Sequence, residues 1–314
     1  MLEADEPVLD ADRPDHDADD EHDHHRERDE TGTHAARIIL NAVPETLPLY
    51  RVTAKNTSSG ENKIHDDATA RRYGFRGALV PGVTVYAYMT QPLVAAFGSA
   101  WLARGTADVR FVKPVLEGEE LVVSGVVTAR DARGVTATLT GATAATPECA
   151  TLTATIPAGL PTPVNVAGYG EAPLPEPRPD ATREHWTSLA TLGTPRAHYD
   201  IAAAEAYLAK VGEPLALYRG VGGWVHPAFL LEQGNRAVDR NVRMGPWIHA
   251  GSVVRHLGGA RVGERLATRG RVRSLFEKKG REFVELDLVV TAGEPARPVA
   301  HVLHTAIYRL PPPE

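Results

Sequence analysis

A carboxylate, an amide and an imidazole fall within five residues of each other in the stretch 60–65, as Glu61, Asn62 and His65. An imidazole has an ordinary pKa near neutral pH, so His65 can both take up and release a proton. Glu61 is a candidate acid/base partner, and the Asn62 amide can orient a water because it both donates and accepts. These residue types at this spacing predict general acid–base chemistry.

A buried helix is predicted directly after this stretch. Residues 81–97 are apolar on nearly every face, with Pro81 at the start and Pro92 expected to bend the helix or mark its last turn. Free amides at a helix N-terminus favour a partly negative carbonyl oxygen, so the Gly82 N–H is a candidate to polarise a carbonyl group. Glycine at 77 and 82 could equally serve backbone conformation. The predicted substrate-binding residues are Gly77, Pro81, Gly82, Val83 and Tyr86.

The chain resembles itself at an offset of 145 residues. Without any gap, this offset places Tyr73, Arg110, Gly118-Glu119 and Gly125 on Tyr218, Arg255, Gly263-Glu264 and Gly270. Glycines, a Gly-Glu turn and one arginine in a single register predict an internal repeat.

Both halves show the same order of predicted elements. In the first, the helix at 81–97 precedes strand-like runs at 107–114, 120–130, 135–141 and 149–156. In the second, a helix at 226–242 precedes runs at 246–256, 265–274, 283–291 and 299–309. A curved antiparallel sheet wrapped around one long helix buries an apolar helix on all sides, which predicts an α+β fold made of two such repeats.

Composition predicts the domain boundaries. Residues 1–35 are rich in Asp, His and Arg and poor in large apolar groups, so we expect a disordered acidic, His-rich tail. The first repeat is expected at 36–156 and the second at 184–314. Prolines crowd residues 157–183, which predicts a linker because proline breaks both helices and central strands.

Charge and cysteine content narrow the class of protein. Residues 1–30 contain 14 Asp and Glu but 3 Arg, a balance of −11, whereas the remainder has 26 acids and 31 bases, or +5. No basic run with interleaved aromatics appears, so a nucleic-acid partner is not expected. Cys149 is the only cysteine, which fits a reducing compartment. We find no signal peptide and no apolar run of the roughly 20 residues that span a bilayer, and expect a cytoplasmic protein.

The motif and the element order resemble the MaoC-like acyl dehydratases and (R)-specific enoyl-CoA hydratases, a family with the hot-dog fold and often two repeats in one chain. The family motif reads Asp-x-Asn-Pro-Ile/Leu-His, followed by a short helix and a His-Gly pair that opens the central helix. Asn62, Ile64, His65 and Gly82 match its Asn, aliphatic, His and Gly positions. The resemblance implies a double hot-dog hydratase or dehydratase acting on an acyl-CoA or acyl carrier protein thioester. No metal or redox cofactor is expected, because the sequence has neither a glycine motif for nucleotide phosphates nor a metal-ligand set.

Three positions depart from the family motif: Gly60 replaces its catalytic Asp, Lys63 its Pro, and Pro81 the His of its His-Gly pair. Glu61 has one more methylene than Asp, roughly 1.5 Å of extra reach, and could recover the position of the missing carboxylate. It could equally point outward, because a one-residue shift in an extended segment reverses side-chain direction.

Other polar residues have two interpretations each. Asn62 could orient water or form a turn through its side chain, and Asp66 or Asp67 is expected to cap a short helix at 68–73. The second half has no acid-Asn-His run, and we expect it to shape the acyl tunnel. His226 and His249 could touch a ligand there, although histidines on strands are commonly structural.

Two other functions remain open at this stage. A thioesterase would use Glu61 or Asp67 to activate water toward the carbonyl carbon. A non-catalytic acyl-binding or assembly subunit is favoured by the absence of Asp at position 60. A homodimer is also open, because hot-dog repeats usually pair and one chain can supply its own pair.

Overall fold

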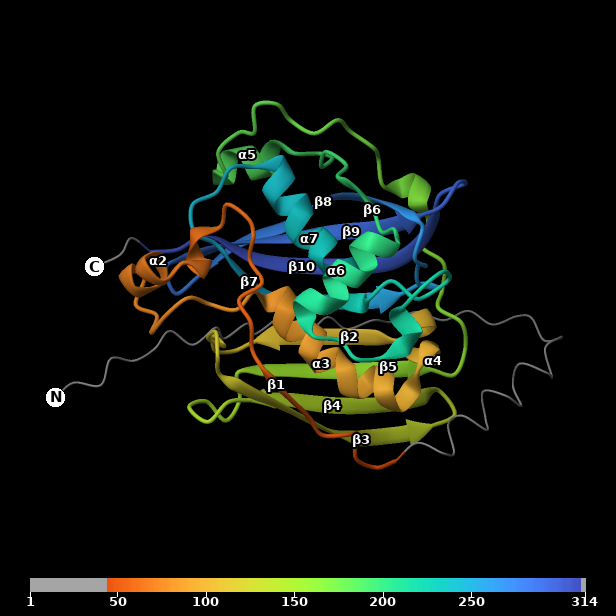
Figure 1. Ribbon diagram of the computed structural model, residues 1–314. Helices are drawn as coiled ribbons and strands as arrows, with labels where there is room; N and C mark the ends of the chain where they lie inside the picture. Colours follow the sequence, from red (N-terminus) through yellow and green to blue (C-terminus); the bar gives the residue numbers. More distant parts are fainter. Residues whose placement is uncertain (1–43, 312–314) are drawn as a thin grey trace.

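Ten strands form a single antiparallel sheet in the computed structural model, which describes residues 44–311 (Figure 1). Their order is β1-β3-β4-β5-β2-β7-β10-β9-β8-β6. The strands are β1 (Tyr50–Thr53), β2 (Thr106–Phe111), β3 (Glu120–Asp131), β4 (Gly134–Ala142), β5 (Ala150–Pro157), β6 (Arg196–His198), β7 (Ile248–His256), β8 (Arg265–Lys278), β9 (Arg281–Ala292) and β10 (Arg297–Arg309). The predicted tail at 1–35 lies outside the described residues.

The sheet has two similar halves that meet at its centre. β2 pairs with β7 in antiparallel register, from Thr106 opposite Arg255 to Arg110 opposite Gly251. On either side of this junction the strand order runs through the same pattern, β2-β5-β4-β3-β1 in one half and β7-β10-β9-β8-β6 in the other. The 145-residue offset carries β2 onto residues 251–256, within β7. The sequence repeat therefore corresponds to a repeat in topology.

The two longest helices lie on the same face of this sheet and contact each other (Figure 1). α3 (Gly82–Phe97) packs on β1, β3, β4 and β7, and α7 (Pro227–Asn241) packs on β8, β9 and β10. Twelve of the 16 residues of α3 are buried, as its all-round apolar sequence predicts. Pro92 lies inside α3, which continues to Phe97 and ends at Gly98, whose φ is +56°.

Shorter helices complete the described part of the chain. They are η1 (Lys63–His65), α2 (Asp67–Arg72), α4 (Ser99–Arg104), η2 (Val166–Gly168), α5 (Arg183–Ser188), α6 (Ile201–Val211) and η3 (Ala216–Tyr218). The predicted strands of both halves match observed strands to within a few residues. The sequence prediction did not include the edge strands β1 and β6 or the short helices α4 and α5. An α+β fold with a long antiparallel sheet is confirmed.

Apolar packing fixes the loop that carries the predicted motif. Ile64, Phe75 and Leu79 from the first half form a small buried cluster with Ile248 and Ile307 from β7 and β10. Ile64 is only 1% exposed. Burying a side chain of this size contributes on the order of 2 kcal/mol, so the motif loop is held against the strands of the second half.

Candidate active site

His65 ends the 3₁₀ turn η1 and is held by a backbone contact. Its Nδ1 lies 2.7 Å from the carbonyl oxygen of Leu79. A carbonyl oxygen can only accept, so Nδ1 carries the proton and the neutral ring has a bare Nε2. Burial lowers the pKa of His65, and the Leu79 bond offsets this only in part. His65 is therefore a neutral imidazole at pH 7 whose Nε2 can act as a base.

Asn62 holds the motif loop against the second half. Its Nδ2 donates to the Trp247 carbonyl oxygen at 2.9 Å, and its Oδ1 accepts the Trp247 N–H at 3.2 Å. Oδ1 also accepts the Ile64 N–H at 3.3 Å, which caps η1. The second hydrogen on Nδ2 points toward His65 Nε2 at 3.4 Å. Asn62 thus combines both predicted roles, since it forms the turn and also faces the base.

Both residues line a small cavity between the two halves of the chain. Its volume is about 40 Å³, enough for one or two water molecules. The lining residues are Asn62, Ile64, His65, Leu79, Val80, Pro81, Gly82, Val85, Phe111, Lys113, Pro114, Val115, Asn235, Trp247, Ile248 and His249. None of these residues is Asp or Glu.

The N-terminus of α3 forms another wall of this cavity. Pro81 is the N-cap residue, and its side chain makes no capping hydrogen bond to the first amides of the helix. Gly82 is closely packed: a Cβ built on it would lie 2.9 Å from Phe111 Cε2 and 3.1 Å from His249 Nδ1. Only glycine lets these rings approach the helix start. The positive end of α3 borders the same cavity as His65.

Glu61 is not part of this cavity. Its side chain is 79% exposed and pairs with Arg178 at 2.8 Å, and this partner lowers the pKa of the carboxyl group. The outward direction follows from the alternation of side chains along an extended segment, because Asn62 points inward. The carboxylate therefore does not recover the position left by Gly60.

The remaining predicted residues fall into two groups. Asp67 Oδ1 accepts the Ala78 N–H at 2.7 Å, and Gly77 packs against the same oxygen, so both close a turn outside the cavity. Asp66 caps α2 by accepting the Thr69 N–H at 3.1 Å. Val83 and Tyr86 on α3 are buried in the large core and do not line the cavity.

The second half supplies polar groups that were not in the predicted site. Asn235 on α7 and His249 on β7 both line the cavity, and Asn235 Oδ1 and His249 Nδ1 have no hydrogen-bond partner among the described residues. His249 was a possible ligand contact from the sequence, and the structure places it on the cavity wall, two residues after the Asn62-bound Trp247. His226 lies outside the cavity, where its Nδ1 caps α7 by accepting the Ala228 N–H at 3.1 Å.

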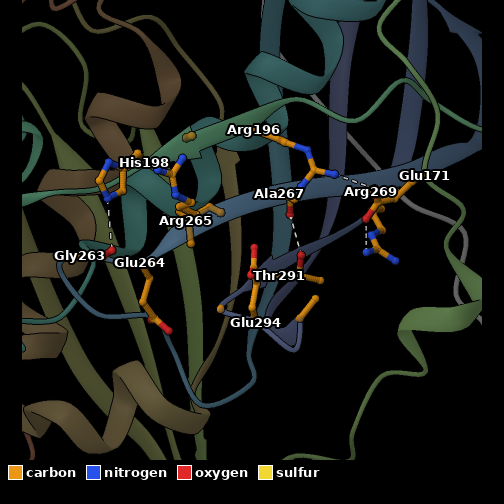
Figure 2. Close-up of a pocket in the computed structure, with 14 residues that line it drawn as sticks. Glu171, Arg196, His198, Gly263, Glu264, Arg265, Ala267, Arg269, Thr291 and Glu294 are labelled. Carbon is orange, nitrogen blue, oxygen red and sulfur yellow. Dashed lines mark hydrogen bonds and ion pairs between the residues drawn. The ribbon is translucent and has the colours of Figure 1, made fainter.

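A second cavity, of about 720 Å³, lies beside β6 and β8. Figure 2 shows Arg196 and Arg269 converging on Glu171, and both form ion pairs with it. His198 bonds the Gly263 carbonyl oxygen at 3.3 Å. The acidic and basic side chains that line this second cavity balance each other in charge. None of the predicted site residues lines it, so we place the candidate site at His65.

Two further properties concern residues 44–311 as a whole. No three His, Cys, Asp or Glu side chains in this range group closely enough to hold a metal ion. None of its helices is long and apolar enough to cross a membrane.

Comparison with known proteins relates the chain to others by structure only. No family model matches the sequence, and no curated protein matches it. A solved structure of a "MaoC-like dehydratase" matches with a TM-score of 0.56 at 12% identity, covering 84% of this chain and 98% of that one. RV0216 from Mycobacterium tuberculosis, described as having a double hot-dog fold, matches with a TM-score of 0.59 at 15% identity, covering 85% and 97%.

An acyl-CoA thioesterase II, TesB2 from Mycobacterium marinum, also matches, with a TM-score of 0.47 at 14% identity and coverage of 88% and 98%. At these identities the two matches with TM-scores of 0.56 and 0.59 support the hot-dog fold and do not establish the reaction.

Proposed function

We propose that this protein is an acyl-thioester hydratase or dehydratase that interconverts 3-hydroxyacyl and 2-enoyl groups on coenzyme A or acyl carrier protein. One observation carries the proposal: the bare Nε2 of His65 and the N-terminus of α3 at Gly82 border the same cavity. A base beside a positive helix end is suited to proton transfer next to a polarised carbonyl. The structural match to a MaoC-like dehydratase agrees with it at the level of the fold.

In the hydration direction, His65 Nε2 takes a proton from water while the water oxygen bonds to Cβ of the enoyl group. The Cα=Cβ electron pair moves to Cα and onto the thioester oxygen, where the Gly82 N–H stabilises the enolate. The enolate then takes a proton at Cα, and His65 can return the proton that it took up. The Asn62 Nδ2 hydrogen that now faces Nε2 at 3.4 Å can bond instead to a water that enters between them, which leaves Nε2 free to take the water's proton.

The proposal includes the arrangement of the two repeats. The first repeat, 36–156, and the second, 184–314, would each be a hot dog with α3 or α7 as its central helix, joined by residues 157–183. Chemistry would belong to the first repeat, and the second would close the acyl site from the side of Asn235 and Trp247. The cavity of about 40 Å³ is smaller than an acyl group, so it must widen when the substrate binds.

Loss of the enoyl-thioester absorbance of crotonyl-CoA or a medium-chain enoyl-CoA tests the reaction. We expect the purified full chain to remove this absorbance, and H65A to lower kcat by about 10²–10⁴-fold, the usual contribution of a general acid–base group. H198A is the matched control, because His198 is an exposed histidine away from the site. Unchanged absorbance with the wild-type chain, or full activity in H65A, would contradict the proposal.

A non-catalytic acyl-binding role is the second candidate, favoured by one observation: no carboxylate lines the cavity. Acyl-CoA binding measured by calorimetry without turnover would support it. The thioesterase alternative has less support, because Glu61 is paired with Arg178 and Asp67 is bound to the Ala78 N–H. Release of free coenzyme A, detected with a thiol reagent, distinguishes it from hydration.

A further inference from the structure

Three buried polar side chains form a chain behind one wall of the cavity. His249 Nε2 lies 2.9 Å from Ser252 Oγ, and Ser252 Oγ lies 3.1 Å from His304 Nδ1. The exposed fractions of the three residues are 6%, 4% and 0%. The two rings are 4.3 Å apart between centroids, so the serine links rings that already pack together.

Both histidines in this chain are neutral. Burial lowers the pKa of His304 to about 3, and burial together with the neighbouring His304 holds the pKa of His249 well below its usual value. The Ser252 hydroxyl has one hydrogen, so it donates to one ring and accepts an N–H from the other. Only two arrangements satisfy both bonds. In one of them His249 Nδ1 is bare, and in the other it carries the hydrogen.

The free nitrogen of His249 lies beside the start of α3, the helix end to which the proposed function assigns the substrate carbonyl. His249 Nδ1 is 3.1 Å from the position of a Cβ built on Gly82, and it has no hydrogen-bond partner among the described residues. The other unpartnered polar atom on the cavity wall, Asn235 Oδ1, can only accept. A carbonyl oxygen needs donors, so of these two atoms only His249 Nδ1 can bind it.

We propose that His249 Nδ1–H is a second donor to the thioester oxygen, opposite the Gly82 N–H, and that Ser252 and His304 position it. This inference rests on the proposed function, because it concerns the carbonyl of the same acyl thioester. Binding a carbonyl oxygen selects the arrangement in which His304 Nδ1–H donates to Ser252 and Ser252 O–H donates to His249 Nε2. No proton is transferred to the oxygen, and no net charge is created in the buried chain.

A neutral donor suits this position for a physical reason. Charge develops on the thioester oxygen as the enolate forms, and a fixed donor in a dry site stabilises it without rearranging solvent. An imidazolium ion would have to be held in the same apolar surroundings, next to Phe111 with ring centroids 4.9 Å apart. A neutral imidazole held by a serine avoids that desolvation cost.

The test measures the bound carbonyl directly. Butyryl-CoA labelled with ¹³C at the thioester carbon cannot be hydrated, and difference infrared spectroscopy reports the stretching frequency of its carbonyl. We expect the frequency to fall on binding to the wild-type chain and to return toward the solution value with H249F. H249N, which places an amide donor near the Nδ1 position, should restore part of the shift. In crotonyl-CoA hydration, H249F should lower kcat about 10²–10³-fold with little change in KM.

Ser252 provides a second variant that retains His249. S252A removes the hydroxyl that fixes the tautomer, so the carbonyl shift and kcat should fall between those of wild type and H249F. If H249F does not fold, the carbonyl frequency and kcat of S252A and H249N provide the test. An unchanged carbonyl frequency in the folded variants would overturn the role of His249.

The failure of this inference can be told apart from failure of the proposed function. If the wild-type chain hydrates crotonyl-CoA and H65A does not, but the His249 and Ser252 variants keep wild-type kcat and carbonyl frequency, only the role of His249 is wrong. If a His249-dependent carbonyl shift occurs without hydration, the reaction is wrong and the carbonyl site stands.

Discussion

Asn62 and Trp247, 185 residues apart, are joined by two hydrogen bonds between the Asn62 amide and the Trp247 backbone, at 2.9 and 3.2 Å. The amide pairs with the start of β7 as a neighbouring strand would. Because the same amide faces His65 Nε2, the base in the first half is positioned by the backbone of the second. A cavity between the halves depends on this contact for its shape.

N62A should therefore affect both stability and function. It leaves the N–H and the carbonyl of Trp247 without their side-chain partner, which costs about 1–3 kcal/mol for buried groups. Urea unfolding measures this loss, and hydration of crotonyl-CoA should fall at least tenfold. N165A is the control, because Asn165 caps an exposed turn and its replacement should change stability by about 0.5 kcal/mol. Equal stability of N62A and wild type would contradict this role of the Trp247 contact.

G82A should obstruct the site. The new methyl would lie 2.9 Å from Phe111 Cε2 and 3.1 Å from His249 Nδ1, so these rings must move. Overpacking of this kind costs roughly 1–3 kcal/mol of folding stability. We expect kcat to fall by more than this loss of stability alone would explain, as measured by hydration rates and thermal unfolding of the same sample. G60A is the matched control, since nothing lies within 4 Å of its Cβ position. Wild-type activity in G82A would show that Gly82 and its neighbours do not form the site.

E61Q should keep its activity. The Glu61 carboxylate points to solvent and to Arg178, outside the cavity, so removing its charge leaves His65 and Asn62 in place. We expect kcat and KM within about threefold of wild type, close to the ±0.5 kcal/mol typical of surface substitutions. Initial rates of crotonyl-CoA hydration measure this. A loss of kcat as large as that of H65A would mean that Glu61 reaches the substrate after all.

D239N should change the pH dependence of stability. Burial raises the pKa of Asp239 from 3.8 to about 6, against the hydrogen bond from Trp247 Nε1 and the charge of Arg178. The folded chain then holds this proton more tightly than the unfolded chain. The wild type gains full stability from this group below pH 4 and loses that stability as pH rises to about 6.

The free energy of unfolding of D239N, relative to that of wild type, should therefore rise between pH 4 and pH 6 and stay level above pH 6. The rise should be at most about 3 kcal/mol. Thermal unfolding of both chains from pH 4 to pH 8 measures it. D131N is the contrasting control, because Arg133 lowers the pKa of Asp131, so this group changes stability only below about pH 4 and the difference between D131N and wild type should stay nearly constant from pH 4 to pH 8. A constant difference between D239N and wild type across this range would refute the raised pKa.

Much of the fold could be read from local patterns. The apolar run of α3 and the alternation in β2 to β5 are properties of neighbouring residues, and the 145-residue repeat appears when the sequence is compared with itself; together they predicted the order of elements. The edge strands were missed because β6 has three residues and β1 has four, too few to show a period. Of the predicted site residues, Asn62, His65, Pro81 and Gly82 line the cavity, and Glu61, Gly77, Val83 and Tyr86 do not.

By itself, the sequence determined the helices and strands, their duplication and the choice of His65 as the candidate base. Periodicity, motif spacing and the repeat can all be read from the order of residues along the chain. Only the tertiary structure decided which side chains meet: it turned Glu61 toward Arg178 and brought Asn235, Trp247 and His249 to His65. The reason is geometric. Alternation along an extended segment sets side-chain direction residue by residue, and the partners across the cavity are chosen by how β2 and β7 pair, a contact between residues about 145 apart.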